Sequence, residues 1–240
     1  FESLATNLAR MVASVGSYFY STTADTLYVN LYNQNHAHFQ LGGQEVRVDQ
    51  VTNYPWDGEV ELTFNVDQPT TFEVALRIPA WCRQFTAQLN GASVDTATTG
   101  GYLRISRTWA KGDQIKLSLS MPVERIASHP DIRHDAGQIA LQRGPVVYCL
   151  EEADNGPRLA NVALPSTSEL TASFEPGLFG GTGVITGEAV RAEPAEWPGG
   201  LYQPQSQVQD TRTSFTFKAI PYAFWSNRQK GEMRVWVRQI

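Results

Sequence analysis

Aromatic rings stand beside hydrogen-bonding side chains in two short segments of this sequence. Trp56 is followed directly by Asp57, and the segment from Tyr222 to Trp225 alternates aromatic rings with a small residue. An aromatic ring offers a flat apolar face with a polar edge, and a carboxylate accepts hydrogen bonds from hydroxyl groups. A sugar needs this combination, so we take Trp56, Asp57, Tyr222 and Trp225 as candidate carbohydrate-binding residues.

Each segment also has a structural interpretation, which the residue types favour. Pro55 to Gly58 has the composition of a tight turn, in which Asp57 and Gly58 would serve the backbone. The rings from Tyr222 to Trp225 could fill the core before the last strand, which would leave Arg228, Lys230 and Arg234 on a solvated rim. Both interpretations stay open for the sequence alone.

Metal chemistry has few candidates. His36 and His38 flank one residue, so on a strand they would share a face at a spacing that zinc can use. No further ligand of the expected kind lies nearby in the sequence, and an exposed strand pair is favoured. We predict no metal ligand in this chain.

Candidates for covalent or acid-base catalysis are equally weak. Cys82 and Cys149 have no histidine near them in the sequence that could act as a general base, and both read as small buried hydrophobes, although a disulfide between them stays open. Glu151, Glu152 and Asp154 follow an apolar run and could line a groove, but a solvated exit from that strand is favoured. We therefore predict no catalytic residue.

Composition limits the partners. The net charge is -5, from 19 basic and 24 acidic residues without a run of either sign, which argues against nucleic acid. No segment approaches the ~20 apolar residues that span a bilayer, so a membrane is not expected. Aromatic residues make up 11% of the chain and charged residues only 18%. These values favour neutral partners, while the sequence does not specify a compartment.

Short alternating segments dominate the chain after residue 25. Strand-like runs, among them Glu59 to Val66 and Phe85 to Leu89, are separated by turn residues such as Gly42-Gly43 and Asn90-Gly91, without crossover helices between them. The alternation breaks around Pro122 and His129-Pro130-Asp131. We predict a mainly β chain of two consecutive antiparallel β-sandwich (jelly-roll-like) domains, residues 21–127 and 128–240, preceded by one N-terminal α-helix within residues 1–20.

The N-terminal helix needs a partner. Between Leu4 and Gly16 its apolar side chains recur at a spacing of 3.6 residues and form one stripe that includes Leu8 and Met11. Nothing helical follows that could cover this stripe. We expect the helix to pack against other helices or to pair two copies of the chain as a homodimer.

Several segments together resemble the C-terminal part of the bacterial β-L-arabinofuranosidase family, glycoside hydrolase family 127. The resemblance covers essentially the whole chain in the family's order. The segments that carry it are Asn7 to Arg10, Ser17-Tyr18, Thr26 to Tyr32, Tyr54 to Gly58, Leu76 to Pro79, Trp81-Cys82, Gln142 to Pro145, Tyr148 to Glu151, Ala219 to Tyr222, Trp225 to Arg228 and Gly231 to Trp236.

The resemblance implies an accessory role for this chain. Similar proteins carry catalysis on an N-terminal (α/α)6 barrel, in which a zinc-bound cysteine attacks the sugar, and two β-sandwiches follow. The helix within residues 1–20 then resembles the last barrel helix, and Ser3 and Leu4 occupy the positions of the family's paired cysteines. We expect no cofactor in this chain and no hydrolase activity from it alone. The alternatives are a separate carbohydrate-binding module and an interaction module that docks on a separate helical barrel.

Overall fold

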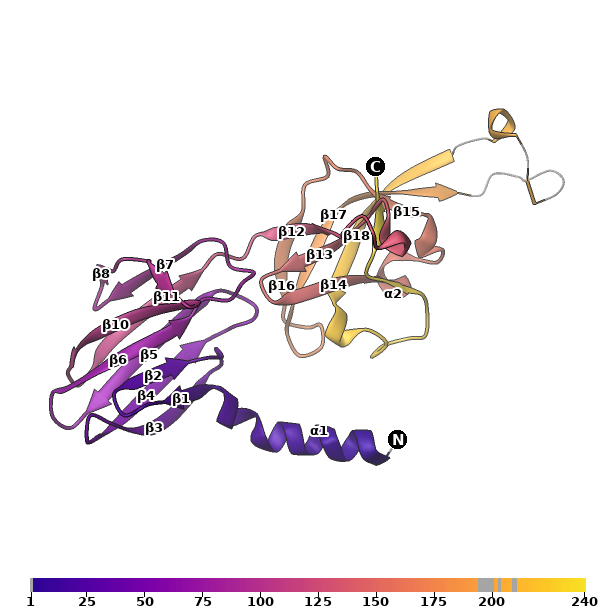
Figure 1. Cartoon of the computed structure of the whole chain (residues 1–240). Coiled ribbons are helices and arrows are strands. Elements are labelled where there is room, and N and C mark those ends of the chain that lie inside the picture. The colour runs from indigo at the N-terminus through magenta and orange to yellow at the C-terminus, as the bar shows by residue number, and fades with distance from the viewer. Residues whose placement is uncertain (1, 194–200, 203, 209–210) are drawn as a thin grey trace. The chain divides into compact units, whose positions relative to one another are not determined.

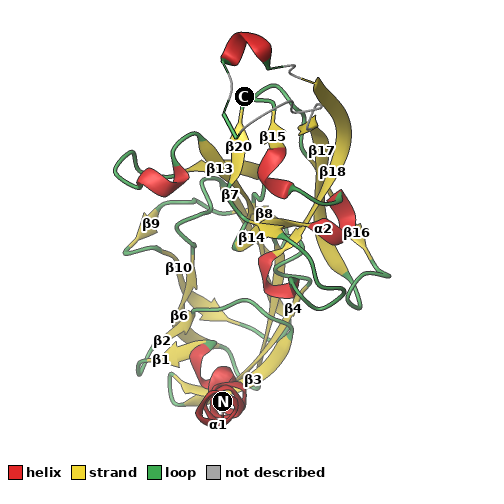
Figure 2. Cartoon of the chain, turned by 90° about the vertical axis from the view of Figure 1, so that its right-hand side faces the viewer, coloured by secondary structure: helices red, strands yellow, loops and turns green. Residues whose placement is uncertain are grey.

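The computed structural model describes residues 2–193, 201–202, 204–208 and 211–240. Strands dominate both of the compact units into which the chain divides, Phe1–Met121 and Pro122–Ile240 (Figures 1 and 2). The predicted mainly β fold with one N-terminal helix is confirmed. No described helix has the length and apolar character needed to cross a membrane.

The N-terminal helix α1 spans Glu2–Ser14 and continues into a 3-10 turn, η1, at Val15–Tyr18. Its expected apolar stripe is exposed: Leu8, Met11 and Val12 keep 62%, 64% and 66% of their accessible surface. Figure 1 shows α1 extending away from the sheets of its own unit. The side chains of Ser3 and Leu4, which matter for the family resemblance, lie outside the described part of the chain.

The first unit is a sandwich of two sheets, as expected. One sheet has the strand order β1-β2-β6-β10-β9 and the other β3-β4-β5-β11-β7-β8. All the pairings are antiparallel except that of β2 with β6, which is parallel. The strands are β1 (Tyr20–Thr22), β2 (Thr26–Val29), β3 (Asn35–Leu41), β4 (Gln44–Thr52), β5 (Glu59–Val66), β6 (Thr70–Arg77), β7 (Phe85–Leu89), β8 (Ala92–Ser93), β9 (Thr98–Thr99), β10 (Tyr102–Trp109) and β11 (Asp113–Leu119).

Alternating side chains build the core between these sheets. Trp109 lies at its centre, fully buried, with its indole nitrogen donating to the carbonyl oxygen of Phe72 at 3.0 Å. The Trp109 ring packs against Phe64, with centroids 4.4 Å apart. Two-residue turns set the register, as at Asn90-Gly91, where both φ angles are positive. Asparagine and glycine tolerate this conformation, which suits a tight hairpin.

A buried carboxylate fixes the start of β11. Asp113 accepts hydrogen bonds from the backbone N–H of Ala110 (2.8 Å) and the side-chain amide of Asn90 (2.7 Å), and Arg107 lies 3.5 Å away. Burial acts to raise the pKa of Asp113, but these donors and the guanidinium outweigh it and lower the pKa below its ordinary value. The ionised carboxylate therefore stabilises the folded first unit.

We expect an Asp113→Asn variant to be less stable than the wild type at neutral pH. Its free energy of unfolding should also decrease less as the pH is lowered. Because the folded pKa lies below the unfolded pKa, the contribution is complete above about pH 4 and disappears as pH falls through the folded pKa. Hydrogen bonds to a charged group suggest a loss of about 1.5–3 kcal/mol at pH 7. Urea unfolding at neutral and acid pH measures this, with exposed Asp67→Asn as the control. If the free energy of unfolding of the wild type and of Asp113→Asn decreased equally with falling pH, the stabilising role of the ionised Asp113 would be contradicted.

The second unit contains one sheet whose pairings form a closed path. β13 pairs with β20 through its first residues and with β14 through its last, and the path continues β20-β15-β17-β18-β14. Among the described strands of this unit, only β15 and β20 pair in parallel. The strands are β12 (Val123–Ala127), β13 (Gln138–Arg143), β14 (Val146–Glu151), β15 (Val162–Leu164), β16 (Thr171–Glu175), β17 (Thr182–Glu193), β18 (Thr211–Pro221), β19 (Met233–Arg234) and β20 (Val237–Gln239).

Two features of this unit were not predicted from the sequence. Hydrogen bonds join all of its described strands into one path. The division between the units lies at Met121 and Pro122, whereas the sequence placed it between residues 127 and 128. The reason is β12, which follows Pro122 directly and pairs along β13, so that residues 123–127 belong to the second unit.

Short helical turns connect the strands of the second unit. They are η2 (Arg133–Asp135), α2 (Glu152–Asn155), η3 (Leu159–Asn161), η4 (Gln205–Gln207) and η5 (Tyr222–Phe224). The sequence predicted no helix after the first, and these one-turn elements are too short to show an amphipathic period. The last of them, η5, carries the candidate binding residue Tyr222, and Trp225 follows it directly.

Candidate functional site

Trp56 and Asp57 lie in a turn that leads into β5. The backbone N–H of Trp56 donates to the carbonyl of Asn53 at 2.9 Å, and a carboxylate oxygen of Asp57 accepts from the N–H of Glu59 at 3.1 Å. The turn interpretation of Pro55 to Gly58 is thus confirmed. Both side chains are half-buried. Asp57 also lines a pocket of about 300 Å³ with Glu59, Glu61 and Lys116, which Trp56 does not line.

Tyr222 and Trp225 present a pair of aromatic rings at the surface of the second unit. The ring planes are 22° from parallel, with centroids 6.3 Å apart, and the side chains keep 45% and 41% of their accessible surface. Core filling applies only to Phe224 between them, which is half-buried and stacks on Phe179 with centroids 5.0 Å apart. The structure thus leaves these two candidate rings accessible.

A charged cluster holds the loop that follows these rings. Arg228 bonds Glu151 at 2.5 Å and both carboxylate oxygens of Asp154, at 2.9 and 2.5 Å. The other oxygen of Glu151 accepts from the N–H of Ser226 at 2.7 Å. The hydrogen bonds that Arg228 donates to Asp154, and the one that it donates to Glu151, outweigh the opposite effect of burial and raise the pKa of Arg228. The guanidinium therefore keeps its charge at the carboxylates.

This cluster corrects two expectations. Glu151 and Asp154 are not a solvated exit from β14, since their side chains keep only 7% and 13% of their accessible surface. Arg228 is not a solvated rim residue, because both carboxylates hold it. Arg228 and Glu151 are 77 positions apart in the sequence, so no local pattern could pair them. Charge of opposite sign was the only available signal.

A pocket of about 730 Å³ opens beside Tyr222. Val147 of β14, Met233 of β19 and Trp236 contribute apolar surface to it. Polar side chains come from the η2 segment, β13 and β19, and Trp225 is not among the lining residues. The polar lining residues are His134, Asp135, Gln138 and Arg234.

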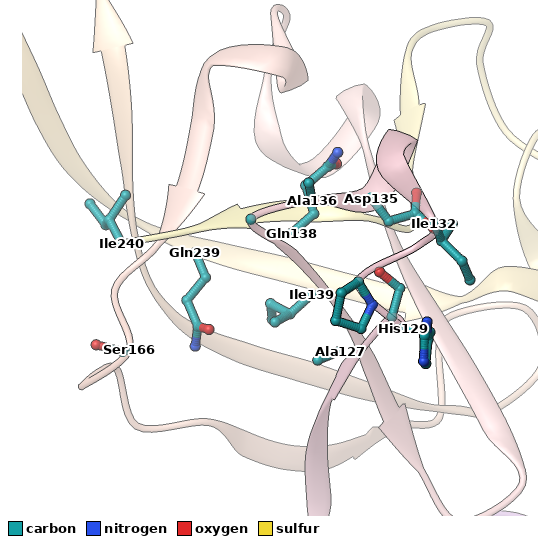
Figure 3. A pocket seen from close by; sticks show the side chains of 13 residues that line it. Ala127, His129, Ile132, Asp135, Ala136, Gln138, Ile139, Ser166, Gln239 and Ile240 are labelled. Atoms are coloured by element: carbon teal, nitrogen blue, oxygen red, sulfur yellow. The ribbon is translucent and has the colours of Figure 1, made fainter.

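Figure 3 shows a second pocket of this unit, which has a volume of about 620 Å³. Residues from Ala127 to Ile139 line it together with Ser166 and the C-terminal residues Gln239 and Ile240. Asp135 and Gln138 line both pockets. None of the four candidate binding residues lines this one.

Both cysteines are free thiols. Cys149 is fully buried, and burial, followed by the nearby charge of Glu151, raises its pKa to about 12. Cys82 is half-buried, its pKa is raised by burial, and its thiol donates to the carbonyl of Gln84 at 3.2 Å. Neither environment favours a thiolate, which a nucleophile or zinc ligand requires.

We expect the two thiols to react at very different rates. At pH 8 a pKa of about 12 leaves roughly 10⁻⁴ of Cys149 as thiolate, and burial blocks the reagent as well. Ellman's reagent should therefore modify Cys82 slowly in the native protein and Cys149 only after unfolding. Cys82→Ser is the control, since it should remove the native reaction. Equal native rates would contradict the assignment.

The described residues include no group of three or more His, Cys, Asp or Glu that could hold a metal. His36 and His38 are both exposed on β3, and the Nδ1 of His38 lies 3.2 Å from a carboxylate oxygen of Glu45. The favoured interpretation, an exposed strand pair, is confirmed. With two protonated thiols and these solvated histidines, the described donors do not fit a zinc-thiolate centre.

Two family models match the two units, except for the first 25 residues of the first unit. Residues 26–121 match "Beta-L-arabinofuranosidase, GH127 middle domain", and residues 123–238 match "Glycoside hydrolase family 127 C-terminal domain". The matches meet between residues 121 and 123, where the structure divides the chain.

Individual relatives agree with these matches. A non-reducing end β-L-arabinofuranosidase from Bifidobacterium longum subsp. longum is 33% identical over 97% of the chain, which spans 36% of that protein. The crystal structure of a GH127 β-L-arabinofuranosidase from Geobacillus stearothermophilus T6 superposes with a TM-score of 0.92 at 47% identity, over 98% of this chain and 37% of that one. A GH127 β-arabinofuranosidase superposes with a TM-score of 0.85 at 27% identity, over 98% of this chain and 38% of that one. The chain thus spans little more than a third of these relatives.

Proposed function

Because this chain belongs to glycoside hydrolase family 127, of which it carries the middle and C-terminal domains, we propose that it is the accessory β region of a β-L-arabinofuranosidase. Its role is to support the helical catalytic domain that the family resemblance implies. The zinc-bound cysteine implied for that domain has no counterpart among the described side chains. No chemical step is therefore assigned to this chain.

The exposed face of α1 carries this proposal. Leu8, Met11 and Val12 form one stripe and remain largely accessible. Burying an apolar side chain of this size contributes about 1.5–3 kcal/mol, so the stripe can hold α1 against neighbouring helices. A bundle of helices buries such a stripe along its length.

A chimera tests the proposal. The matching region of the Geobacillus stearothermophilus enzyme would be replaced by this chain, and hydrolysis of a β-L-arabinofuranoside would be measured. We expect the chimera to be active, and the same enzyme truncated before this region to be inactive or insoluble. The 240-residue chain alone should show neither turnover nor stoichiometric zinc. A folded but inactive chimera, or turnover by the chain alone, would refute the proposal.

Carbohydrate binding is a second candidate function, supported by the exposed ring pair of Tyr222 and Trp225. Trp56 and Asp57 form a separate candidate in the first unit, where the half-buried indole and the turn carboxylate leave less surface for a ligand. Calorimetry or NMR titration of the chain with neutral sugars tests this function. A purely supporting region would bind none of them.

A further inference from the structure

The pocket beside Tyr222 combines an aromatic face with two charged side chains of opposite sign, Asp135 and Arg234. Within the described part of the chain, the carboxylate of Asp135 and the guanidinium of Arg234 make no ion pair or side-chain hydrogen bond, although both line this pocket. Both residues are half-buried. Partly desolvated charges usually find a partner, so these two are available to a ligand.

The polar side chains of the pocket can bond a ligand hydroxyl group both when it donates and when it accepts a hydrogen bond. Asp135 accepts hydrogen bonds and Arg234 only donates them, while Gln138 uses its amide nitrogen on the carbonyl of His134 at 2.8 Å and keeps its oxygen as an acceptor. The negative charge of Asp135 and the positive charge of Arg234 balance each other in this pocket. This balance favours an uncharged polyhydroxyl ligand over an acidic one.

The aromatic face is held in place before any ligand binds. Tyr222 lines the pocket and has the nearly parallel ring of Trp225 beside it. The loop after Trp225 is fixed to β14 through the hydrogen bond from Ser226 to Glu151 and the bonds of Arg228 to Glu151 and Asp154. A platform fixed in this way loses little conformational entropy on binding.

We propose that this pocket binds one neutral furanose or pyranose unit of a glycan. The apolar face of the sugar stacks on Tyr222, and its hydroxyl groups bond Asp135 and Arg234. This inference rests on the second candidate function and adds its location, ligand class and polar partners. For one sugar ring in an open pocket we expect a dissociation constant of about 1 mM.

NMR titration of the ¹⁵N-labelled chain tests the proposal. The probes are methyl β-L-arabinofuranoside, methyl β-D-glucoside, and galacturonic acid as the acidic comparison. A neutral glycoside should shift the resonances of Gln138, Val147 and Trp236. Tyr222→Ala should weaken binding at least tenfold and Asp135→Asn several-fold, whereas Tyr222→Phe and the exposed Tyr202→Ala control should change it less than twofold.

The possible outcomes distinguish a failure of this pocket from a failure of carbohydrate binding as a function of the chain. Binding that persists in Tyr222→Ala but disappears in Trp56→Ala would overturn this pocket and retain carbohydrate binding. Binding of galacturonic acid alone would overturn the neutral ligand class. No binding of any probe at tens of millimolar would overturn both. If Tyr222→Ala fails to fold, the resonances shifted in the wild type and the affinity of the Asp135→Asn variant decide instead.

Discussion

Replacing Arg228 with methionine is expected to lower the free energy of unfolding of the second unit by about 3–5 kcal/mol. The reason is the charge left behind. Arg228 bonds the carboxylates of Glu151 and Asp154, which are largely buried in the folded protein. Methionine fills similar volume but leaves both carboxylates without their cation, and removing one partner of a buried ion pair costs far more than the pair contributes.

Urea unfolding followed by circular dichroism measures this loss. Arg228→Lys is the matched control, because lysine keeps the positive charge but lacks the planar guanidinium that bonds both carboxylates. Its free energy of unfolding should lie between those of the wild type and Arg228→Met. Adding Glu151→Gln to the Arg228→Met background should recover part of the loss. A loss below about 1 kcal/mol would place the cluster among ordinary surface pairs and contradict this assignment.

The Arg228→Met variant should also affect the ring pair of Tyr222 and Trp225. Because Glu151 also accepts from the N–H of Ser226, loss of Arg228 should loosen the segment that begins at Tyr222. A variant that remains folded should then bind a neutral sugar more weakly without any change in the pocket lining. The cluster is therefore a positioning element for the proposed pocket.

Making the apolar face of α1 charged is expected to change the association state of the chain. Produced without a helical partner, the 240-residue chain exposes Leu8, Met11 and Val12 together. Two such stripes can cover each other, so we expect concentration-dependent dimers or larger species. Burial of three side chains on each copy, at about 1.5–3 kcal/mol each, is enough to shift association more than a hundredfold. Lysine retains helix propensity, so the triple lysine variant of these residues should be monomeric at 26.6 kDa.

Light scattering coupled to size-exclusion chromatography measures the mass of each species. The matched control adds the same three charges off the stripe, with Thr6→Lys, Ala9→Lys and Ala13→Lys, and should still associate. A monomeric wild-type chain at high concentration would contradict self-association through α1. Equal behaviour of the two lysine variants would show that net charge, and not the stripe, controls the mass.

Local chemistry in the sequence determined most of the elements. The strands Glu59–Val66 and Phe85–Leu89 were expected at the bounds that the structure has, because alternation and turn residues act between near neighbours. The turn at Trp56-Asp57 was found in the same way. Strand β12 was missed because Pro122 and His129-Pro130 flank a segment of only five residues.

Tertiary structure alone decided the pairing and the environment of individual groups. The closed path of strands in the second unit, the parallel pairing of β2 with β6 and the burial of Glu151 all depend on segments far apart in the sequence. Alternation within a strand shows which of its faces is apolar but not which strand lies beside it. The ion-pair partner of a charged side chain cannot be identified before the fold places the two side chains next to each other. The sequence therefore determined that this is a mainly β chain with one unpartnered helix and candidate aromatic residues. Folding decided which rings remain accessible and which carboxylates are neutralised, because solvent exposure and ion pairing arise only when distant segments pack together.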